Sequence, residues 1–399
     1  MQTLVLVDLN EIRQNLLPFT FVRPVSEIRV GILRIREKWE KELGATASWM
    51  TESYLKPLYP EPAFDAPCLL VNSSLLPDAG LISFIHSAQD GFCYFQGGQF
   101  LFGKVKNLDS FKNIEYVRQE YSGSVRQIQF PWDIFGMNGA EIRHDFERIQ
   151  AGSKSEELKD EFTRVYNPKN LWLGKHVKCR AAVLNAEDGP IVIGDNVEIQ
   201  EGAVVRGPVY IGDGAVINMG AKIRPDTTIG PLCKVGGELS NVVFFGHSNK
   251  AHDGFLGNSV IAEWCNLGAD TNTSNLKNNY QPVSIYSYAE RGMVNTGQIF
   301  CGLLMGDHCK TGINSMFNTG TVMGVAVNVY DSSFPPKFIP SFSWGTGHGG
   351  FETYKFEKFL ETERLVMTRR KKELSQEYLD MLQYLFKELQ RPSVTVDAL

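Results

Sequence analysis

The fold is decided by residues 193–240, which read in blocks of six as IGDNVE IQEGAV VRGPVY IGDGAV INMGAK IRPDTT IGPLCK VGGELS. Every block begins with a branched aliphatic residue, and most blocks carry a small or β-branched residue at their fifth position. A helix would repeat every 3.6 residues or so and a plain strand every second residue. A period of six fits neither, so the stretch is an internal repeat whose unit must be explained as a whole.

A flat strand followed by a bend accounts for a unit of six residues. Three such units close a triangular coil, with the aliphatic side chain pointing inward and the small residue leaving room near the bend. Glycine often follows the aliphatic residue, where the backbone turns and a Cβ would be penalised; the positions are Gly194, Gly212, Gly230 and Gly236. Successive coils stack and pair their strands in parallel. We therefore predict a left-handed parallel β-helix.

The same register recurs on both sides of this stretch. It is present upstream at Leu173 and Cys179, and downstream at Ile261 and Leu267. It returns at five further positions, Met305, Thr311, Phe317, Met323 and Val329. Three cysteines (Cys233, Cys265 and Cys309) occupy the small inward position, so we expect core residues there and not metal ligands. Residues 241–253 and 272–298 leave the register, and such interruptions of a solenoid are expected to project as loops and to line the site.

Four regions of different composition predict the domain organisation. Residues 1–125 mix short apolar runs with helical patterns and are expected to form an α/β domain. Residues 126–165 are charged and partly helical, which indicates a connector. Residues 166–347 hold the predicted β-helix, and residues 348–399 return to a helical pattern with an apolar stripe. The basic run at residues 369–372 is more typical of a solvated helical turn than of a phosphate site, although contact with a phosphate of coenzyme A stays open.

Composition limits the classes of partner and the cellular setting that the protein is expected to have. Lys and Arg number 40 against 45 Asp and Glu, and this balance argues against nucleic acid as a partner. No apolar run approaches the roughly 18 residues of a membrane span, so no membrane partner is expected. Seven scattered cysteines form neither a disulfide framework nor a metal knuckle, which favours a reducing, cytoplasmic setting and no metal site.

Two segments of the predicted β-helix carry a family resemblance. They are Lys250-Ala-His-Asp-Gly-Phe-Leu-Gly257 and Asn266-Leu-Gly-Ala-Asp-Thr-Asn-Thr-Ser-Asn275, with Lys222-Ile-Arg-Pro225 before them. Over roughly 180 residues the chain resembles the hexapeptide-repeat acyltransferases, and most closely the acetyltransferase half of the bifunctional GlmU family. The resemblance implies that His252 is the catalytic base. Histidine suits this role because its unperturbed pKa lies near working pH and it can remove the proton of an attacking amine.

The resemblance also implies the other site residues. Arg224, Asn266 and Asn275 are expected to bind the substrate, a sugar phosphate or nucleotide sugar. Acetyl-CoA is the expected cosubstrate, and the residues expected to bind it are Ala269, Thr271 and Gly312. Family members are trimers, so we expect a homotrimer. The chain departs from the family at Ser240 and Asn241, where the family carries lysines that touch the acceptor, and this leaves the identity of the acceptor open.

The N-terminal domain resembles a sugar nucleotidyltransferase in the segment that runs from Leu17 to Gly31, LPFTFVRPVSEIRVG. The family follows its first strand with a glycine-rich loop that cradles phosphates. Here the corresponding stretch, residues 8–13, is DLNEIR and contains no glycine. Asn72 stands where the family usually offers a Mg²⁺-binding aspartate, so Mg²⁺ is expected only if this domain is active. Arg13, Arg23 and Lys38 are candidate phosphate ligands, and each taken singly is more typical of a surface charge.

Two functions remain open at this point. The first is CoA-dependent acetyl or acyl transfer to an amino-sugar phosphate or nucleotide sugar, with a possible sugar-1-phosphate nucleotidyltransferase activity in the N-terminal domain. The second is a non-catalytic trimer that binds sugar nucleotides or serves as a scaffold. The missing phosphate loop favours the second, and the segment around His252 favours the first.

Overall fold

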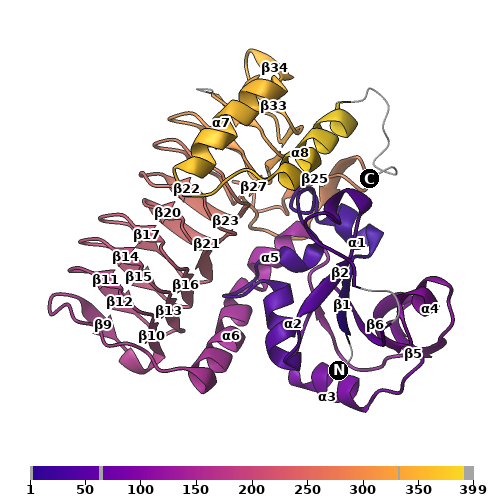
Figure 1. The fold of residues 1–399 in the computed structure, drawn as a ribbon. Coiled ribbons are helices and arrows are strands. Elements are labelled where there is room, and N and C mark those ends of the chain that lie inside the picture. The colour runs from indigo at the N-terminus through magenta and orange to yellow at the C-terminus, as the bar shows by residue number, and fades with distance from the viewer. Residues whose placement is uncertain (1–2, 63–65, 331–332, 391–399) are drawn as a thin grey trace.

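The computed structural model describes residues 3–62, 66–330 and 333–390 (Figure 1). Near the N-terminus lies a six-stranded mixed sheet in the order β2-β1-β3-β6-β5-β7. Its strands are β1 (Thr3–Val7), β2 (Ala47–Met50), β3 (Cys68–Asn72), β5 (Phe92–Gln96), β6 (Gln99–Val105) and β7 (Val117–Glu120). Leu4 and Leu6 of β1 belong to one apolar cluster and Val5 and Val7 to another. The alternation shows that both faces of the sheet are covered, as in an α/β domain.

Helices cover this sheet and part of the β-helix. They are α1 (Asn10–Asn15), α2 (Ile35–Leu43), α3 (Ala79–Ser87), α4 (Leu108–Lys112), α5 (Pro131–Gly136), α6 (Asn138–Gly152), α7 (Phe356–Thr368) and α8 (Gln376–Leu389). Local chemistry explains several of their ends. The side chains of Asp78 and Ser375 accept hydrogen bonds at the starts of α3 and α8, and Gly44 ends α2 with a positive φ of 60°. A short pair, β4 (Leu75–Leu76) and β8 (Arg126–Gln127), joins the sheet region to α5.

The rest of the chain winds into a parallel β-helix with three flat faces, which confirms the predicted fold. Face 1 consists of β11 (Lys178–Cys179), β14 (Glu198–Ile199), β17 (Val216–Ile217), β20 (Lys234–Val235), β22 (Asn249–Lys250), β28 (Lys310–Thr311), β31 (Asn328–Val329) and β33 (Ser343–Thr346), with β34 (Gly350–Thr353) antiparallel to β33. Face 2 consists of β9 (Arg164–Tyr166), β12 (Val183–Asn185), β15 (Val204–Arg206), β18 (Lys222–Ile223), the first halves of β21 (Glu238–Phe244) and β23 (Phe255–Ile261), β24 (Asn272–Thr273) and β29 (Met316–Phe317).

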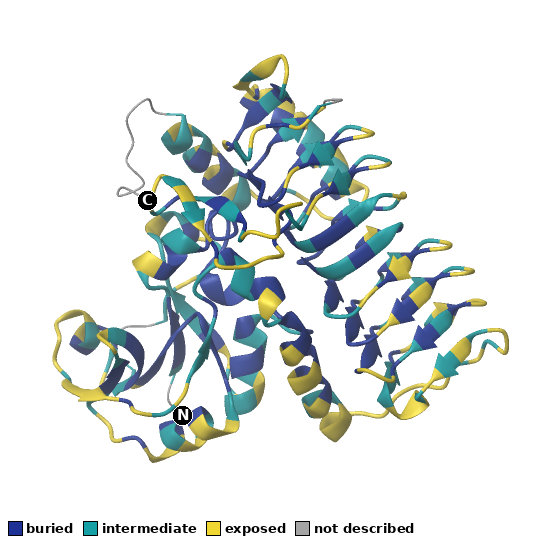
Figure 2. Ribbon diagram, turned by 180° about the vertical axis from the view of Figure 1, so that it is seen from behind, coloured by how far each residue is buried: buried dark blue, intermediate teal, exposed yellow. Residues whose placement is uncertain are grey.

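Face 3 carries the second halves of β21 and β23. Its other strands are β10 (Leu171–Leu173), β13 (Ile191–Ile193), β16 (Val209–Ile211), β19 (Thr227–Ile229), β27 (Leu304–Met305), β30 (Val322–Met323) and β32 (Phe338–Ile339). The predicted aliphatic positions point inward from all three faces and form one buried cluster, together with Cys233, Cys265 and Cys309. Figure 2 shows the buried strands running along the coils and the exposed residues gathering at the corners.

The two interruptions of the register differ in kind. Residues 241–253 do not project as a loop, and that expectation is wrong for them. The end of β21 and all of β22 lie in this stretch, and β23 follows it. Phe244 and, just after the stretch, Leu256 still belong to the buried core of the coils, so the coil is only shortened. The second interruption does leave the coil, and it forms the hairpin of β25 (Ser284–Ser287) and β26 (Gly292–Asn295). The hairpin does not face the corner at which His252 lies, because its Tyr288 packs edge-on against Phe21 of the N-terminal domain.

The outer side of face 3 is covered by the rest of the chain. Its outward residues (Val243, Val260, Leu304 and Val322) share one apolar cluster with the N-terminal sheet and with Phe359, Leu382 and Leu385 of the C-terminal helices. Nearer the N-terminal end of the coils, Ile142 and Phe146 of α6 pack on Val192 and Tyr210. The N-terminal domain and the β-helix are therefore joined by an apolar core as well as by the chain.

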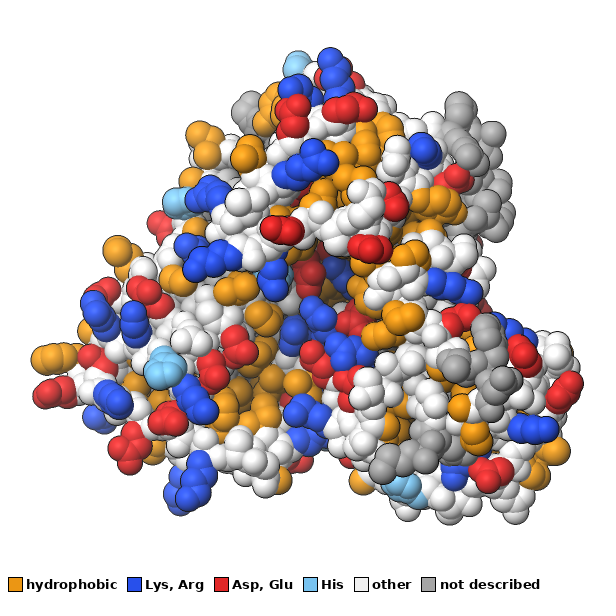
Figure 3. All heavy atoms as spheres, viewed as in Figure 1, with side chains coloured by type: hydrophobic (Ala, Val, Ile, Leu, Met, Phe, Trp, Pro, Cys, Tyr) orange, Lys and Arg blue, Asp and Glu red, His pale blue; other side chains and the backbone are white. Residues whose placement is uncertain are grey.

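Ion pairs also cross this junction, and Figure 3 shows charged side chains gathered in the hollow between the parts. The guanidinium of Arg23 is buried and donates a hydrogen bond to the Asp307 carboxylate at 2.9 Å. Arg34 bridges Glu27 of its own domain, at 3.0 Å, and Glu263 of the β-helix, at 3.2 Å. Burial alone would raise the pKa of Glu263, but Arg23 and Arg34 outweigh burial and lower it. The Glu263 carboxylate therefore stays charged and helps to hold the two parts together.

Two observations concern the chain as a whole. All seven cysteines are unpaired and buried. Within residues 3–62, 66–330 and 333–390, none of the helices is both long and apolar enough to cross a membrane.

Candidate active site

His252 lies at the corner of the β-helix between face 1 and face 2. Its side chain is exposed beside a pocket of about 450 Å³. Five successive coils line this pocket, and their residues are Gln200, Asn218, Met219, Gly236, Gly237, Ala251, His252, Asp253, Ala269 and Asp270. The imidazole thus faces a space that a substrate can enter, and this is the geometry that a general base requires.

Lys250 holds the main chain of this corner from inside the coil. It occupies an inward position, directly in register with Val235 of the preceding coil, and it is 1% exposed. Its ammonium donates hydrogen bonds to the carbonyl oxygens of His252 at 2.8 Å and Asp253 at 3.0 Å. Burial lowers the pKa of Lys250 to about 8 against the opposing attraction of Asp253 and Asp270. Burying a charged group in an apolar core costs free energy, and the hydrogen bonds to the two carbonyl oxygens offset part of that cost.

The neighbouring coils fix the rest of the corner. The Asn218 side-chain amide donates a hydrogen bond to the carbonyl of Ala251 at 2.6 Å. Gly236 must be glycine because a Cβ there would lie 2.4 Å from the same carbonyl oxygen. Gly254 has a positive φ of 114°, and a Cβ on it would lie 2.3 Å from the carbonyl oxygen of Thr271. The main chain on both sides of His252 is therefore held by close stacking against the coils below and above it.

Residues predicted to bind the cosubstrate lie along the same corner. Ala269 lines the His252 pocket. Gly312 lies on the next coil. There the backbone N–H of Asn314 donates a hydrogen bond to the carbonyl of Ala269 at 2.8 Å. Thr271 points into the coil, where its hydroxyl donates to the Gly268 carbonyl at 2.8 Å. The structure brings His252, Ala269 and Gly312 to one corner on three successive coils, while Thr271 presents only its main chain.

The predicted substrate ligands do not lie in the His252 pocket. Arg224 follows β18, where it is exposed and pairs with Glu238 at 3.1 Å. The Asn275 side-chain amide donates to the side chain of Asn258 at 2.8 Å. Asn266 points out from face 1 and lines a different pocket. Arg224 and Asn275 are thus separated from His252 by the width of face 2.

The carboxyl ends of β1 and β3 are closed by hydrogen bonds within the domain. Asp8 accepts from the Thr51 hydroxyl at 2.6 Å, from the Ser73 hydroxyl at 2.5 Å and from the Val25 amide at 3.1 Å. Burial raises the pKa of Asp8 although Arg13 and these hydrogen bonds oppose the rise. Helix α1 stands where a glycine-rich loop would cradle phosphates. No carboxylate stands beside Asp8 at Asn72 or Ser73, so these residues do not fit a Mg²⁺ site of the hard, oxygen-rich kind that the ion prefers.

The three candidate phosphate ligands of this domain are buried, so interpreting them as surface charges is wrong. Arg13 donates to the Thr20 carbonyl and to the Tyr54 hydroxyl. Arg23 pairs with Asp307, and Lys38 is fully buried between Asp145 and Glu141, which lies at 3.0 Å. Their charges are balanced inside the protein, and their positions do not support phosphate binding. No group of three or more His, Cys, Asp or Glu side chains suited to a metal occurs among the residues that the structure describes.

Sequence reasoning missed Lys250 as a functional residue. Its signal is present, because a lysine stands at an inward position at which the neighbouring coils carry Val235 and Leu267. It also missed a second pocket, on face 1, lined by Asn266 and by four basic side chains from distant parts of the chain. The basic run at residues 369–372 is the part of that pocket with a sequence signal, and its meeting with Asn266 on face 1 has none because it depends on how α7 packs.

Comparison with known proteins finds a sugar nucleotidyl transferase family model and relatives named as acetyltransferases. Residues 4–154 match the family model described as sugar nucleotidyl transferase. The uncharacterized acetyltransferase YaiX of Escherichia coli is 35% identical over 171 residues, which cover 42% of this chain and 71% of YaiX. A bifunctional sugar-1-phosphate nucleotidylyltransferase/acetyltransferase of Sulfurisphaera tokodaii is 33% identical over 168 residues, which cover 40% of this chain and 41% of the relative. The bifunctional protein GlmU of Methanococcus aeolicus is 29% identical over 222 residues, which cover 55% of this chain and 46% of that protein. The matches therefore span less than half the length of these two bifunctional relatives.

Proposed function

We propose that this chain, which belongs to the GlmU-like family of sugar nucleotidyltransferases and acetyltransferases, transfers an acetyl group from acetyl-CoA to an amino group on a sugar phosphate or nucleotide sugar. The observation that carries the proposal is the exposed imidazole of His252 beside a pocket of about 450 Å³, on a corner held from within by Lys250. YaiX and the Sulfurisphaera tokodaii protein are both named acetyltransferases, which supports the same chemistry for this chain.

In the proposed reaction His252 acts as the general base. The acceptor nitrogen attacks the thioester carbonyl, and His252 takes a proton from the nitrogen as the C–N bond forms. The C–S bond then breaks, and the departing thiolate of CoA takes the proton from His252. The backbone N–H of Ala269, which borders the pocket, is proposed to stabilise the oxyanion of the intermediate. Gly312, on the coil above, extends the surface along which CoA would lie, and the main chain of Thr271 lies beside it.

The pocket at His252 is shallow for a site that must exclude water, so we propose that a neighbouring copy completes it in a homotrimer. Met219 lines the pocket and is 71% exposed, so a partner that covered the pocket would also bury an apolar side chain, which favours association. A second copy would also bring another side of a β-helix towards His252. This would let Arg224 and Asn275, which are remote from His252 within one chain, take part as substrate ligands. The unpaired cysteines support a reducing compartment such as the cytoplasm.

The N-terminal domain is proposed to be structural and not catalytic. Its Asp8 is fully engaged with hydroxyl and amide donors, and Arg13, Arg23 and Lys38 are engaged inside the protein. The test is release of pyrophosphate from UTP or dTTP with sugar-1-phosphates and Mg²⁺. Turnover in the wild type that is lost in Asp8→Asn would overturn this assignment and restore nucleotidyl transfer as a second activity.

The acetyltransferase proposal is tested by following CoA thiol release from acetyl-CoA over a panel of amino-sugar phosphates and nucleotide amino sugars. His252→Ala is expected to lower kcat/KM by about 10²- to 10⁴-fold, the usual contribution of a general base. His144→Ala, an exposed histidine on α6, is the matched control and should leave kcat/KM unchanged. If the wild type turns over no acceptor, the non-catalytic trimer is the better account. If His252→Ala keeps full activity, His252 is not the base.

A further inference from the structure

A second pocket lies on face 1, on some of the same coils as the His252 pocket and beside the end of α7. Its volume is about 410 Å³. Lys234 and Lys310 enter it from β20 and β28, and Arg369 and Arg370 enter it from the residues that follow α7. We call this space the basic pocket. Figure 3 shows Lys and Arg side chains on this side of the molecule, where α7 meets the β-helix.

The basic pocket carries an unbalanced positive charge. Among the residues that line it within the described part of the chain, none is Asp or Glu. Glu363 of α7, which does not line the pocket, forms an ion pair with Lys310 and offsets that one charge. The carbonyl end of α7 adds the equivalent of about half a negative charge, which is too little for the other three cations. Burial lowers the pKa of Arg370, and repulsion from Arg369 lowers it further. Such an arrangement is unfavourable until an anion enters it.

The pocket is a built arrangement and not a chance gathering of flexible side chains. The Arg370 guanidinium donates to the side-chain oxygen of Asn249 at 2.7 Å, which fixes it over face 1. Lys234, Asn249, Asn266 and Lys310 lie in register on four successive coils. At about 4.8 Å between paired strands, this row is about 14 Å long. Two amides between two ammonium groups, with two guanidinium groups at the side, suit a ligand that carries more than one phosphate.

We propose that the basic pocket binds the diphosphate group of a nucleotide-bearing ligand. CoA and a nucleotide sugar both contain such a group, and the pocket's chemistry recognises what they share. Asn249 faces this pocket, and His252, three residues later, lies at the corner beside it. A diphosphate held here would leave the remainder of its ligand within reach of the proposed site of acetyl transfer. Diphosphate binding itself does not require that acetyl transfer occurs.

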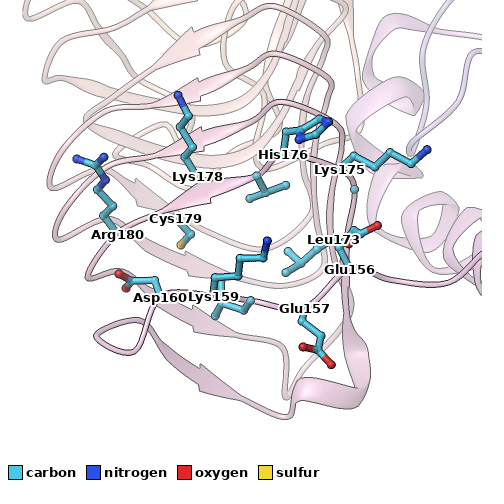
Figure 4. Close-up of a pocket in the computed structure, with 13 residues that line it drawn as sticks. Glu156, Glu157, Lys159, Asp160, Leu173, Lys175, His176, Lys178, Cys179 and Arg180 are labelled. Carbon is cyan, nitrogen blue, oxygen red and sulfur yellow. The ribbon is translucent and has the colours of Figure 1, made fainter.

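A pocket at the N-terminal end of the β-helix provides a comparison within the same molecule (Figure 4). It is of similar volume, about 480 Å³, and Lys159, Lys175, Lys178 and Arg180 also contribute four positive charges. There the acidic side chains Glu156, Glu157 and Asp160 line the same space. Three of its four positive charges are offset by carboxylates, so we expect little affinity for a diphosphate.

The experiment measures binding of inorganic pyrophosphate, CoA and UDP to the purified full chain by isothermal titration calorimetry. The double variant Arg369→Gln/Arg370→Gln is expected to weaken binding of pyrophosphate at least about tenfold. Lys175→Gln/Lys178→Gln, in the pocket at the N-terminal end of the β-helix, is the matched control and should bind as the wild type does. Tighter binding of CoA than of UDP, or the reverse, identifies the source of the diphosphate.

Several outcomes decide the matter. No binding of pyrophosphate, CoA or UDP to the wild type overturns the proposal, as does equal weakening by both double variants. The exposed single variant Lys234→Gln repeats the test if the arginine double variant does not fold, and unchanged affinity there also contradicts the proposal. Binding that persists in His252→Ala supports a diphosphate site even if that chain, or the wild type, transfers no acetyl group.

Discussion

The ammonium group of Lys250 lies inside the β-helix and donates a hydrogen bond to the carbonyl oxygen of His252, 2.8 Å away. The residue proposed to act on the substrate is thus held by its main chain, which leaves its imidazole free at the surface. A lysine is the longest unbranched donor that can reach two carbonyls at a corner from an inward position. Lys250 is therefore a positioning residue for His252.

Replacing Lys250 by Met should lower kcat for acetyl transfer about tenfold while the KM for acetyl-CoA changes little, because the imidazole is displaced and the cosubstrate contacts are not. Lys222→Met, the same change at an exposed position on face 2, is the control. Steady-state kinetics of the three proteins measure the effect. Equal kinetics of Lys250→Met and wild type would show that the corner keeps its shape without the ammonium.

The stability of the protein should also depend on pH through Lys250. The folded pKa of Lys250 is about 8, below its ordinary 10.5, so the unfolded chain binds more protons between these values. Wild type should therefore gain stability relative to Lys250→Met as pH rises from about 8 to about 10.5, by up to about 3 kcal/mol. Urea unfolding of both proteins across this range measures the difference. Parallel curves would mean that Lys250 titrates normally.

The role of Arg224 can be tested against a matched arginine one coil away. Arg206 occupies the equivalent place on β15, and it pairs with Asp188 much as Arg224 pairs with Glu238. Arg224→Ala should raise the KM for a phosphorylated acceptor about tenfold, since an arginine fork binds phosphate well, and should leave the KM for acetyl-CoA unchanged. Arg206→Ala should change neither constant. The assignment fails if the two variants behave alike.

The ion pair between Arg23 and Asp307 should contribute strongly to stability. Asp307→Asn leaves a buried guanidinium whose nearest carboxylate is that of Glu263, at 3.7 Å, and is expected to cost about 3–5 kcal/mol. The exposed pair of Arg206 and Asp188 provides the comparison, and Asp188→Asn should cost about 1 kcal/mol or less. Denaturant unfolding measures both. Similar costs would indicate that water reaches the Arg23 pair.

Acid should weaken the attachment of α7 through Glu363. Burial alone would raise the pKa of Glu363, but His308, at 2.6 Å, and Lys310 outweigh burial and lower the pKa below its ordinary 4.5. A lowered carboxyl pKa stabilises the fold above about pH 4.5 and ceases to do so as pH falls through the folded value. Glu363→Gln should therefore be less stable near pH 7 by about 1–3 kcal/mol and lose less stability on acidification. Unfolding curves near pH 7 and below about pH 4 test this, and identical losses in both proteins would contradict it.

The sequence predicts the β-helix well because its repeat depends on local sterics. Each block of six residues has the same inward aliphatic position, so the pattern recurs along the chain. Ile199, Ile217 and Ile223 could be placed inside the coil by counting alone, and the structure confirms each of them. Residues 241–253 misled the count because a coil can lose residues at two corners and still keep its inward side chains. A shortened coil and an inserted loop break the same register, and only strand pairing distinguishes them.

The candidate site was predictable in part for a related reason. His252, Ala269 and Gly312 fall on one corner because the coils repeat, so their common corner follows from the register. The basic run at residues 369–372 is visible in the sequence, but its place in the basic pocket could not be predicted, because the contact of Arg370 with Asn249 spans 121 positions of the chain and depends on how α7 packs. The burial of Arg23 and Lys38 in ion pairs could likewise not be predicted, because their partners Asp307 and Asp145 lie in distant elements that carry no shared motif.

The apolar cluster that runs from the N-terminal sheet over face 3 to α8 has a consequence for how the molecule melts. Sheet, coils and terminal helices bury their side chains against one another, so none of them can lose its packing without exposing the others. Unfolding should then be a single cooperative transition, and a gene fragment that encodes either half should yield an aggregating product. What resembles two enzymes joined end to end would behave, thermodynamically, as one indivisible body.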